Sequence, residues 1–586
     1  MRQWMVAAKK ADFYAIAEKF HVDPVVARII RNREVIGEKN IRIYLGGNLS
    51  DLSDPHQMKD MDRLVEILAQ KIRKQAHIRI IGDYDVDGVT SSHLFLTALR
   101  RVGAKVDVVI PHRIQDGYGL SLHLLQQAKE DGVDTILTCD NGIAAIDEIA
   151  WAKAQKMTVL VTDHHAVPFE EHEGRRTEKK SLADAVVNPH QQDCRYPYKE
   201  LCGAGVAWNV IRVLYENYDM DKREAEDLLD FVAMATVCDV MSLTGENRIL
   251  VKEGLKRIRH TKNIGLQALM QACNVQPENI SAYHFGYVLG PCVNATGRLD
   301  TARHALRLFE TGQETEAEEI ARDLVDLNQE RKELTLQGVE MAKKLCEEGG
   351  YENDPVLVLF LPDVHESIAG LIAGRIREMY NRPVFVLTRG EEGVKGSGRS
   401  TENYSMYENM CGCVELFTKF GGHPMAAGLS LPEENVEKFR RKINENCPLT
   451  VEEVCPDIHI DMAMPVGYAS TELVHQFALL EPFGKDNPSP LFADRNLSIS
   501  RMWLIGKNRN VLRMSVLSEY GQPVPVIFFG DVETLFAYFT EKFGQEEVEN
   551  ALHGRKNRIL FSMVYTAKID FYQGNENLQL EMKYYR

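Results

Sequence analysis

Residues 76–88 read AHIRIIGDYDVDG, an apolar run that is followed at once by three alternating aspartates and a glycine. The run has the length and β-branched composition of a buried strand. Four comparable runs follow, AKVDVVI (104–110), DTILTC (134–139), MTVLVT (157–162) and ADAVVN (183–188). Helical patterns such as GVTSSHLFLTALRRVG (88–103) and NGIAAIDEIAWAKAQ (141–155) lie between them. Buried strands alternating with helices predict an α/β domain with a doubly wound parallel sheet.

Acidic residues and histidines gather where we expect these strands to end. They form four clusters, namely Asp83, Asp85 and Asp87, then Asp140 in TCDNG, then Asp163, His164 and His165 in VTDHH, and finally Asp239 in TVCDVMSL. A single aspartate after a strand is commonly a helix N-cap, and a histidine pair there can be a hydrogen-bonded loop pair. Together, however, the clusters would meet at one sheet edge, where ligands of this fold bind.

Such a cluster has a specific chemistry. At least five carboxylates and two imidazoles in one small volume repel by several kcal/mol, or are forced to protonate, unless cations are present. Oxygen ligands with an imidazole favour Mn²⁺ or Mg²⁺ over thiolate-bound zinc, and the histidine favours Mn²⁺. Two such ions, about 3.5–4 Å apart, activate water and hold phosphoryl oxygens. The sequence therefore predicts two divalent ions and hydrolysis of a phosphate ester or anhydride.

The rest of the chain predicts further domains. Apolar residues at helical spacing between Ile320 and Leu345 predict one long helix, roughly 313–347, that ends at Gly349-Gly350 and acts as a strut. Strand-like PVLVLFL (355–361) and RPVFVL (382–387) then indicate a smaller α/β unit with a glycine-rich tail. From about residue 455, alternating patterns predict a small antiparallel barrel or sheet, with an OB-fold as the leading candidate.

Composition limits the choice of function class. Acidic residues outnumber basic ones 85 to 69, so nucleic-acid binding would need a local basic patch. The eleven cysteines form no CxxC pair and are expected to be free thiols in a reducing compartment. The chain contains no apolar segment of about 18 residues. We therefore expect a soluble, cytoplasmic protein that does not bind membranes.

The ordered clusters resemble the DHH/DHHA1 phosphoesterase superfamily, and more closely its RecJ family of bacterial single-strand-specific 5′→3′ DNA exonucleases. The matching segments also include PHRIQDGYGLS (111–121), LCGAGVAW (201–208), NATGR (294–298), KGSGRS (395–400), FGGHPMAAGL (420–429) and LEPFGKDNPSPLF (480–492). The sequence departs from the common family pattern at Cys292, in HESIAG (365–370) and at Lys485-Asp486. None of these departures is a candidate metal ligand.

The resemblance implies roles for individual residues. One ion would bind Asp83, Asp85 and Asp140, and the other would bind Asp87, Asp140, His164 and Asp239, with Asp140 bridging. Asp163 would orient a histidine, and His165 would face the scissile phosphate and assist protonation of the leaving oxygen.

The resemblance also implies a 5′-phosphate pocket made of Arg113, Arg298, Ser397 and Arg399, with His423 in the same cleft. Guanidinium groups suit phosphate oxygens, although an arginine taken alone is more often a surface charge, and His423 is as easily a structural turn residue. In the C-terminal module, Arg501, Lys507, Arg509 and Arg513 interleave with Trp503 as in a groove for a single strand. The alternative is a solvated strand face with a hydrophobic core behind it.

The domain boundaries that follow are 1–60 for an N-terminal helical segment, 61–245 for the DHH catalytic domain, 246–347 for a helical region with the connecting helix, 348–452 for the DHHA1 domain and 453–586 for the OB-like domain. The predicted function is metal-dependent 5′→3′ exonuclease action on single-stranded DNA in recombination and repair, by a monomer. The expected partners are single-stranded DNA with a 5′ end, a single-strand binding protein and a RecQ-type helicase.

Two other functions stay open from the sequence. One is a DHH-family phosphodiesterase that acts on short RNA or cyclic dinucleotides, although such relatives are typically shorter and lack the terminal β module. The other is an inactive scaffold of the RecJ type that binds DNA or replication proteins. A scaffold would be expected to lose metal-binding carboxylates, and here every one is present.

Overall fold

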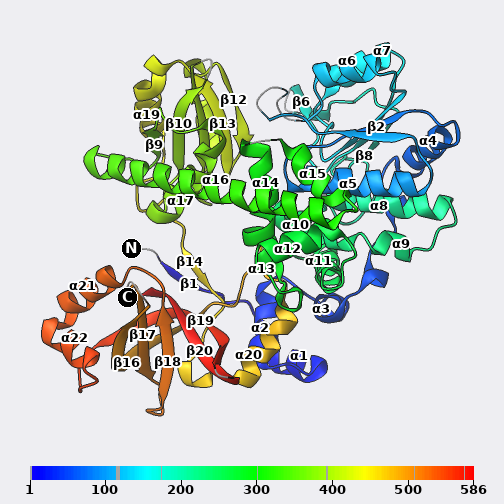
Figure 1. Cartoon of the computed structure of the whole chain (residues 1–586). Coiled ribbons are helices and arrows are strands. Elements are labelled where there is room, and N and C mark those ends of the chain that lie inside the picture. The colour runs from blue at the N-terminus through cyan, green and yellow to red at the C-terminus, as the bar shows by residue number, and fades with distance from the viewer. Residues whose placement is uncertain are drawn as a thin grey trace. The chain divides into compact units, whose positions relative to one another are not determined.

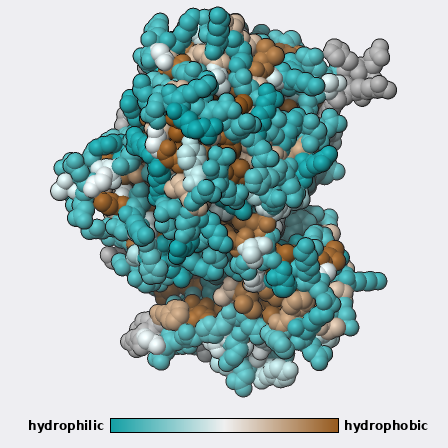
Figure 2. All heavy atoms as spheres, turned by 90° about the vertical axis from the view of Figure 1, so that its right-hand side faces the viewer, coloured by the Kyte–Doolittle hydropathy of each residue, from teal (hydrophilic) through white to brown (hydrophobic). Residues whose placement is uncertain are grey.

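The computed structural model describes residues 3–113, 116, 119–172, 175–299, 301–390, 393–506, 509–572 and 574–586. Contacts within the chain divide it into two compact units (Figure 1). The first unit contains residues 52–241 and 246–456, and the second contains residues 3–51, 242–245 and 457–586. On the face drawn in Figure 2, hydrophilic residues predominate and hydrophobic residues lie in separate groups. Over the described ranges, no helix is both long and apolar enough to cross a membrane.

The first unit begins with the predicted parallel sheet. All five expected strands occur, in the order β3-β2-β4-β5-β8. Their bounds are β2 (Ile78–Ile81), β3 (Val106–Val109), β4 (Thr135–Cys139), β5 (Thr158–Thr162) and β8 (Ala185–Val187). The central strands β2 and β4 are buried throughout, which explains their mainly apolar residues. The one charged residue of β2, Arg79, is hydrogen-bonded to Asp107 and Asp131. The prediction of a parallel α/β sheet is therefore confirmed.

Helices cover both faces of this sheet (Figure 1). One face is covered by α4 (Met61–Arg73), α5 (Val86–Arg101) and α8 (Gly203–Asn217). The other is covered by α6 (Leu122–Glu130) and α7 (Ile146–Ala154), whose Leu125, Ile149 and Ala152 pack on Ile136 and Val159. A two-stranded hairpin, β6 (Phe169–His172) and β7 (Arg175–Glu178), follows β5.

A helical region separates the two sheets of the first unit. It contains α9 (Arg223–Glu226), α10 (Leu229–Cys238), α11 (Gly245–Ile258), α12 (Ile264–Ala272), α13 (Ala282–His284), a π-helical turn (Phe285–Leu289), α14 (Gly290–Leu299), α15 (Ala302–Glu310) and α16 (Glu314–Glu348). The predicted long helix is α16, which ends at Gly349. Its first half packs on α12, α14 and α15, and its second half packs on the next sheet, so it connects the two parts (Figure 1).

His93 of α5 is buried among aromatic side chains. Its ring centroid lies 4.5 Å from that of Phe231 and 5.8 Å from that of Phe309. Burial, and then the charges of Arg100 and Arg101, lower the pKa of His93 to about 3. An unfolded histidine has a pKa of about 6.5, so the unfolded chain binds this proton first. Stability is therefore lost as the pH falls from about 6.5 towards 3.

Replacing His93 with leucine is expected to remove this part of the acid sensitivity. Each unit of pKa difference corresponds to about 1.4 kcal/mol, so the wild type should lose about 2–3 kcal/mol more unfolding free energy than His93→Leu between pH 7.5 and pH 4.5. Urea unfolding at both pH values measures the difference. His123 is exposed on α6 and provides the control, because His123→Leu should keep the wild-type slope. Equal slopes for all three proteins would contradict the burial argument.

The second sheet of this unit is mixed, with the order β12-β13-β11-β10-β9. Its strands are β9 (Leu357–Phe360), β10 (Val384–Gly390), β11 (Gly393–Arg399), β12 (Lys419–His423) and β13 (Ala426–Leu431). Helices α16 and α17 (Glu366–Tyr380) pack on one face, and α18 (Met406–Cys411) and α19 (Val436–Glu445) pack on the other.

Both segments of the expected glycine-rich tail form strands, GVKGSGRS in β11 and FGGHPMAAGL in β12 and β13. Glycine in a strand often marks close packing, and β11 is such a case. A Cβ at Gly398 would lie 2.5 Å from Met406 Sδ and 2.7 Å from a ring carbon of Phe385. The glycines therefore let helix α18 and strand β10 approach the strand closely.

The second unit is built on a closed barrel in which all strand pairs but one are antiparallel. Its strands are β16 (Phe492–Ile505), β17 (Val511–Leu517), β18 (Pro523–Phe528), β19 (Leu560–Tyr572) and β20 (Asn575–Tyr585). They pair in the order β16-β17-β18-β20-β19, and β19 also pairs with β16 and closes the ring. Helices α21 (Val532–Phe543) and α22 (Gln545–Leu552) lie between β18 and β19 in the chain. This topology confirms the predicted OB-fold.

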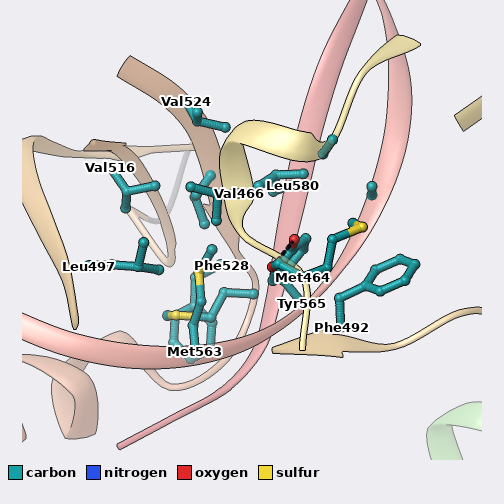
Figure 3. Packing of buried hydrophobic residues seen from close by; sticks show 14 of the residues in the cluster. Met464, Val466, Phe492, Leu497, Val516, Val524, Phe528, Met563, Tyr565 and Leu580 are labelled. Atoms are coloured by element: carbon teal, nitrogen blue, oxygen red, sulfur yellow. Dashed lines mark hydrogen bonds between the residues drawn. The ribbon is translucent and has the colours of Figure 1, made fainter. Parts of the chain in front are cut away.

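Alternate residues of the strands fill the barrel core. Figure 3 shows Phe492, Met563, Tyr565 and Leu580 converging there, and the Tyr565 hydroxyl donates a hydrogen bond to the Met464 carbonyl at 2.9 Å. The remaining elements of the unit are β1 (Trp4–Val6), α1 (Phe13–Phe20), α2 (Pro24–Asn32), α3 (Glu38–Gly46), β14 (Ile458–Ile460), β15 (Met462–Ala463) and α20 (Thr471–Phe477). Contacts thus place residues 3–51 with the barrel, whereas the sequence suggested a separate N-terminal segment.

Candidate functional site

The three alternating aspartates stand between strand β2 and helix α5. Asp83 follows the buried strand, Asp85 caps the helix by accepting a hydrogen bond from the Gly88 amide at 3.0 Å, and Asp87 lies in its first turn. A Cβ at Gly88 would lie 2.4–2.5 Å from backbone atoms of Asp83, so only glycine allows the chain to fold back this tightly. The loop thereby presents three carboxylates within one short segment.

Two neighbouring strands supply further groups at the same edge. Asp140 follows β4 and adopts a left-handed backbone conformation with φ of 60°, which non-glycine residues rarely occupy outside special sites. Asp163, His164 and His165 follow β5. Parallel strands β2, β4 and β5 are adjacent, so their carboxyl ends bring the three segments together.

Asp239 reaches the site from a different kind of element. The prediction that it follows a strand is wrong, because it follows helix α10 and caps its C-terminal end. The residues before it are almost all buried, and a short, continuously apolar run fits a buried helix as well as a strand.

These residues form compact groups of potential ligand atoms. Within each group, all ligand atoms lie within 4.8 Å of one another, and the groups are Asp83 with Asp85 and Asp140, Asp87 with His164 and Asp239, and Asp140 with His164 and His165. The Nε2 atom of His164 lies 3.0 Å from a carboxylate oxygen of Asp140, 3.7 Å from Asp87 and 3.6 Å from Asp239. The structure thus brings together all six aspartate and histidine residues that the sequence suggested as metal ligands.

The electrostatics of the cluster favour bound cations. Burial and the neighbouring Asp85 raise the pKa of Asp83 well above its ordinary value, and burial with Asp87 and Asp85 does the same for the pKa of Asp140. Burial, and then Asp87, also raise the pKa of Asp85. Ionised together without counter-charge, these carboxylates would destabilise the fold. Divalent cations remove that cost.

The donor set also fits a divalent cation. The buried Oδ1 atom of Asp83 and the buried Nε2 atom of His164 have no hydrogen-bond partner in the described part of the chain. Burying such atoms without a partner is costly, and a metal ion would satisfy both. Carboxylate oxygens dominate and no cysteine belongs to any of the groups, which suits Mn²⁺ or Mg²⁺.

Asp163 organises the two histidines. One of its carboxylate oxygens accepts hydrogen bonds from the backbone amides of His164 and His165 and lies 2.7 Å from His165 Nδ1. The other oxygen accepts from the Ile143 amide at 2.8 Å. Although burial lowers the pKa of His165, the hydrogen bond and charge of Asp163 raise it to about 9. The ring of His165 is thus fixed in orientation and partly exposed.

Sequence reasoning missed the residues that hold Asp87. The backbone amides of Gly203 and Ala204, at the start of α8, donate to its two carboxylate oxygens at 2.6 and 2.7 Å. A Cβ at Gly203 would lie 2.6 Å from Asp140 Cβ, so glycine is required there. Asn294 supports the loop from the other side, because its Oδ1 accepts from the Val86 amide at 3.1 Å. The segments 201–208 and 294–298 resembled the family, but their spacing alone gives no role.

A cluster of guanidinium groups lies beside the metal loop. The Arg113 guanidinium carbon is 4.9 Å from the ring centroid of Tyr84, the residue between Asp83 and Asp85. Arg298 of α14 donates to the Ser367 carbonyl at 2.6 Å. Arg399 ends β11 and donates to the Gly398 carbonyl at 2.8 Å.

These arginines share one electrostatic environment. Burial, and then the charges of Arg113, Arg331 and Arg399, lower the pKa of Arg298 to about 10, and burial with Arg113 lowers the pKa of Arg399. In the part of the chain that the structure describes, no carboxylate forms an ion pair with Arg113, Arg298 or Arg399. Within the described ranges these three partly buried cations have no carboxylate partner, an arrangement that suits an anion.

The two other predicted residues of the phosphate pocket, Ser397 and His423, differ in position. Ser397 lines a cavity of about 320 Å³ together with Arg113. His423 is exposed at the end of β12 and is not among the residues that line this cavity. Residues 114, 115, 117 and 118 of the quoted segment 111–121 lie outside the described ranges.

The barrel of the second unit carries an aromatic and basic strand face. Trp503 pairs across the strands with Arg513, and the Arg501 guanidinium lies 5.7 Å from the Trp503 ring. The intervening residues Met502 and Met514 are buried in the core. Arg509 lies in the β16–β17 turn, and Lys507 lies outside the described ranges. The face has both the surface composition that suits a single strand and the hydrophobic core of the alternative interpretation.

Family models match three parts of the chain. The DHH family, N-terminal domain, matches residues 77–236, the DHHA1 domain matches residues 353–447, and the RecJ OB domain matches residues 460–584. The chain is similar to the single-stranded-DNA-specific exonuclease RecJ of Bacillus subtilis, with 33% identity over 87% of this chain and 63% of that protein. It is also similar to the RecJ of Haemophilus influenzae, with 32% identity over 96% of each chain.

Solved structures of a RecJ protein also match this chain. RecJ from Thermus thermophilus in complex with Mn²⁺ matches all of this chain and 79% of that chain, with a TM-score of 0.81 and 25% identity. The same protein in complex with Mg²⁺ matches with a TM-score of 0.76 and 24% identity, covering 78% of that chain. Identity above 30% over nearly the full length of a relative, with three family domains in order, shows that the chain belongs to the RecJ family of single-stranded-DNA-specific exonucleases.

Proposed function

We propose that this protein is a divalent-metal-dependent exonuclease that degrades single-stranded DNA from its 5′ end. The observation that carries the proposal is the position of Arg113 over the ring of Tyr84, between two candidate metal ligands. The guanidinium cluster, acting as an anion site, would thus lie next to the carboxylate cluster. If the arginines held the terminal phosphate of a DNA strand, one of its first phosphodiester bonds would lie at the carboxylate cluster.

The carboxylates and His164 would hold two divalent cations, one at Asp83, Asp85 and Asp140 and the other at Asp87, Asp140, His164 and Asp239. When bound, such ions activate the attacking water and neutralise charge on the phosphate. The Gly203 and Ala204 amides keep the Asp87 carboxylate in place. No side chain is needed as a nucleophile.

His165 is proposed to contact the scissile phosphate. Asp163 holds Nδ1 of the ring, which leaves Nε2 as the atom directed to the substrate. From this position the imidazole can donate a hydrogen bond to a phosphate oxygen and assist protonation of the leaving oxygen. Asp163 therefore acts as a positioning residue for the histidine.

The Arg501, Trp503 and Arg513 face of the barrel is proposed to bind the strand beyond the cleavage site. Trp503→Ala is expected to weaken binding of a long single strand by about 1–3 kcal/mol, because one base loses its stacking partner. Fluorescence anisotropy with a labelled oligonucleotide measures the change. Trp503→Phe should retain most of the affinity. If the alanine variant bound as tightly as the wild type, this face would not be the binding surface.

One digestion experiment tests the function itself. A single-stranded oligonucleotide labelled at the 5′ or the 3′ end is incubated with Mn²⁺, Mg²⁺ or EDTA. We expect mononucleotides to appear first from the 5′-labelled end with either metal, and no release with EDTA. Hydrolysis of cyclic dinucleotides or very short RNA alone would favour the phosphodiesterase alternative, and binding without hydrolysis would favour the scaffold.

The cellular setting is proposed from family resemblance. We infer a cytoplasmic monomer that works with a single-strand binding protein and a RecQ-type helicase in recombination and repair. Light scattering of the purified protein measures its oligomeric state. Digestion of duplex DNA in the presence and absence of such a helicase tests whether unwinding supplies the substrate.

A further inference from the structure

The cavity beside the arginine cluster is larger than one terminal phosphate requires. Its volume is about 320 Å³, at the lower end of the range of about 300–1,000 Å³ typical of small-ligand pockets. Arg113 and Ser397, both assigned above to the terminal phosphate, line one part of it. The lining also includes Lys395, Lys419 and Ser430, which no part of the proposed function uses.

These three additional residues form a row across the sheet. Lys395 of β11 is paired with Ser430 of β13, and Ser430 is paired with Lys419 of β12. Directly paired residues of antiparallel strands point to the same face, and so do residues two apart on one strand. Ser397 therefore points to the same face as the row, about 6.6–6.8 Å from Lys395 along β11.

The surface of the sheet beside Ser397 is open. Gly428 is the partner of Ser397 on β13 and also lines the cavity. A Cβ added at Gly428 would meet only the Gly396 carbonyl oxygen, at 3.9 Å. The glycine leaves the sheet without a side chain beside Ser397, two residues along β13 from Ser430 of the row.

The charge of this part of the cavity suits a second anionic group. Lys395 forms an ion pair of 2.8 Å with Glu366, the one acidic residue among the described residues that line the cavity. Lys419 is exposed and forms no ion pair within the described ranges. The lining therefore contains Arg113, Lys395 and Lys419 as cations against one carboxylate. Hydroxyl groups of Ser397 and Ser430 add hydrogen-bond donors.

We propose that this cavity extends the terminal-phosphate site, so that the protein accepts strands whose 5′ end carries a diphosphate or triphosphate. Arg113 and Ser397 bind the phosphate next to the sugar, and Lys395, Ser430 and Lys419 bind the phosphates beyond it. The inference rests on the proposed exonuclease function and adds the class of 5′ end that the same site accepts. Lysine side chains bind phosphates without requiring the planar fork geometry of arginine, which suits a flexible polyphosphate.

The reaction itself is unchanged for such an end. Water adds across the first internucleotide phosphodiester, its hydroxyl goes to phosphorus, the bond from phosphorus to the 3′ oxygen breaks, and a proton goes to that oxygen. The first nucleotide then leaves as a nucleoside 5′-triphosphate, and the remaining strand carries a 5′-monophosphate. Removal of pyrophosphate before cleavage would instead release a nucleoside monophosphate.

The test compares one DNA sequence with a 5′-hydroxyl, a 5′-monophosphate or a 5′-triphosphate, labelled in the first nucleotide. We expect the wild type to cleave the triphosphorylated strand with a kcat/KM within about threefold of that for the monophosphorylated strand and to release the labelled triphosphate. Lys419→Met should lower kcat/KM for the triphosphorylated strand about tenfold, because one charge-assisted hydrogen bond is lost, and leave the value for the monophosphorylated strand within twofold. Lys395→Met should act in the same direction.

Lys438 provides the matched control, since it is an exposed lysine on α19 outside the cavity, and Lys438→Met should behave as the wild type with all three ends. Thermal melting of each variant verifies folding. Refusal of the triphosphorylated strand by a wild type that degrades the monophosphorylated one would overturn this inference alone. The inference would also be overturned if Lys419→Met lowered kcat/KM equally for both phosphorylated ends, or if the triphosphorylated strand released a nucleoside monophosphate. Inactivity towards the monophosphorylated strand would overturn the proposed function as well.

Discussion

Asp140→Asn is expected to lower the rate of single-strand hydrolysis by about 10³-fold or more. The substitution keeps the shape of the side chain but removes the charge that two of the ligand groups share. Loss of even a residue that only orients a ligand typically costs about 10–100-fold in metal affinity or activity, and loss of one electrostatic contact to the reacting group costs about 10²–10³-fold. Loss of a ligand that both ions share should lower the rate by at least the larger of these factors. Quenched digestion of a 5′-phosphorylated strand with Mn²⁺ measures the rate.

The same variant should not be destabilised without metal. Neighbouring carboxylates and burial both disfavour the ionised form of Asp140, so asparagine relieves repulsion. Thermal melting in EDTA should give an equal or higher Tm, whereas the stabilisation by Mn²⁺, about 2.7 kcal/mol at 100 times the Kd for one site, should be reduced. Asp134 is the matched control, because it immediately precedes β4 at the end opposite Asp140. Asp134→Asn should keep its activity, and an active Asp140→Asn enzyme would refute the shared-ligand role.

Arg298→Gln is expected to remove the preference for a 5′-phosphate. The residue is partly buried, and no carboxylate of the described ranges pairs with it, so a bound phosphate would be its counter-charge. Loss of one partner of a buried charge pair costs about 2–5 kcal/mol, which corresponds to a rise in KM of about 30-fold or more for 5′-phosphorylated strands. The KM for 5′-hydroxyl strands should change little. Steady-state kinetics with the two substrates measures the difference.

Two further variants test whether the effect of Arg298→Gln is specific. Arg298→Lys keeps the charge but lacks the planar fork, so its effect should be intermediate. Arg303, five residues further along and exposed on α15, is the matched control, and Arg303→Gln should be unchanged. An Arg298→Gln enzyme that still discriminates between the two 5′ ends would show that the guanidinium cluster is not the phosphate site.

Most of the catalytic centre could be predicted because the carboxyl ends of adjacent parallel strands lie at the same edge of a sheet. Short apolar runs identify buried strands, and the residues after Ile81, Cys139 and Thr162 necessarily reach one edge when β2, β4 and β5 are neighbours. Alternating patterns likewise predicted the barrel, since core residues occupy every second position of β17.

The errors have identifiable physical causes. Asp239 was assigned to a strand because a buried helix can be apolar on every side, as α10 is, and then lacks helical periodicity. Gly203 and Ala204 were missed because they act through backbone amides, which leave no side-chain signature in the sequence.

The central claim is that two divalent cations bind among these carboxylates beside the arginine cluster. Anomalous diffraction from crystals soaked in Mn²⁺ tests it most directly. We predict two peaks, one among Asp83, Asp85 and Asp140 and one among Asp87, His164 and Asp239. A single peak, or manganese bound elsewhere while these groups stay empty, would contradict the account.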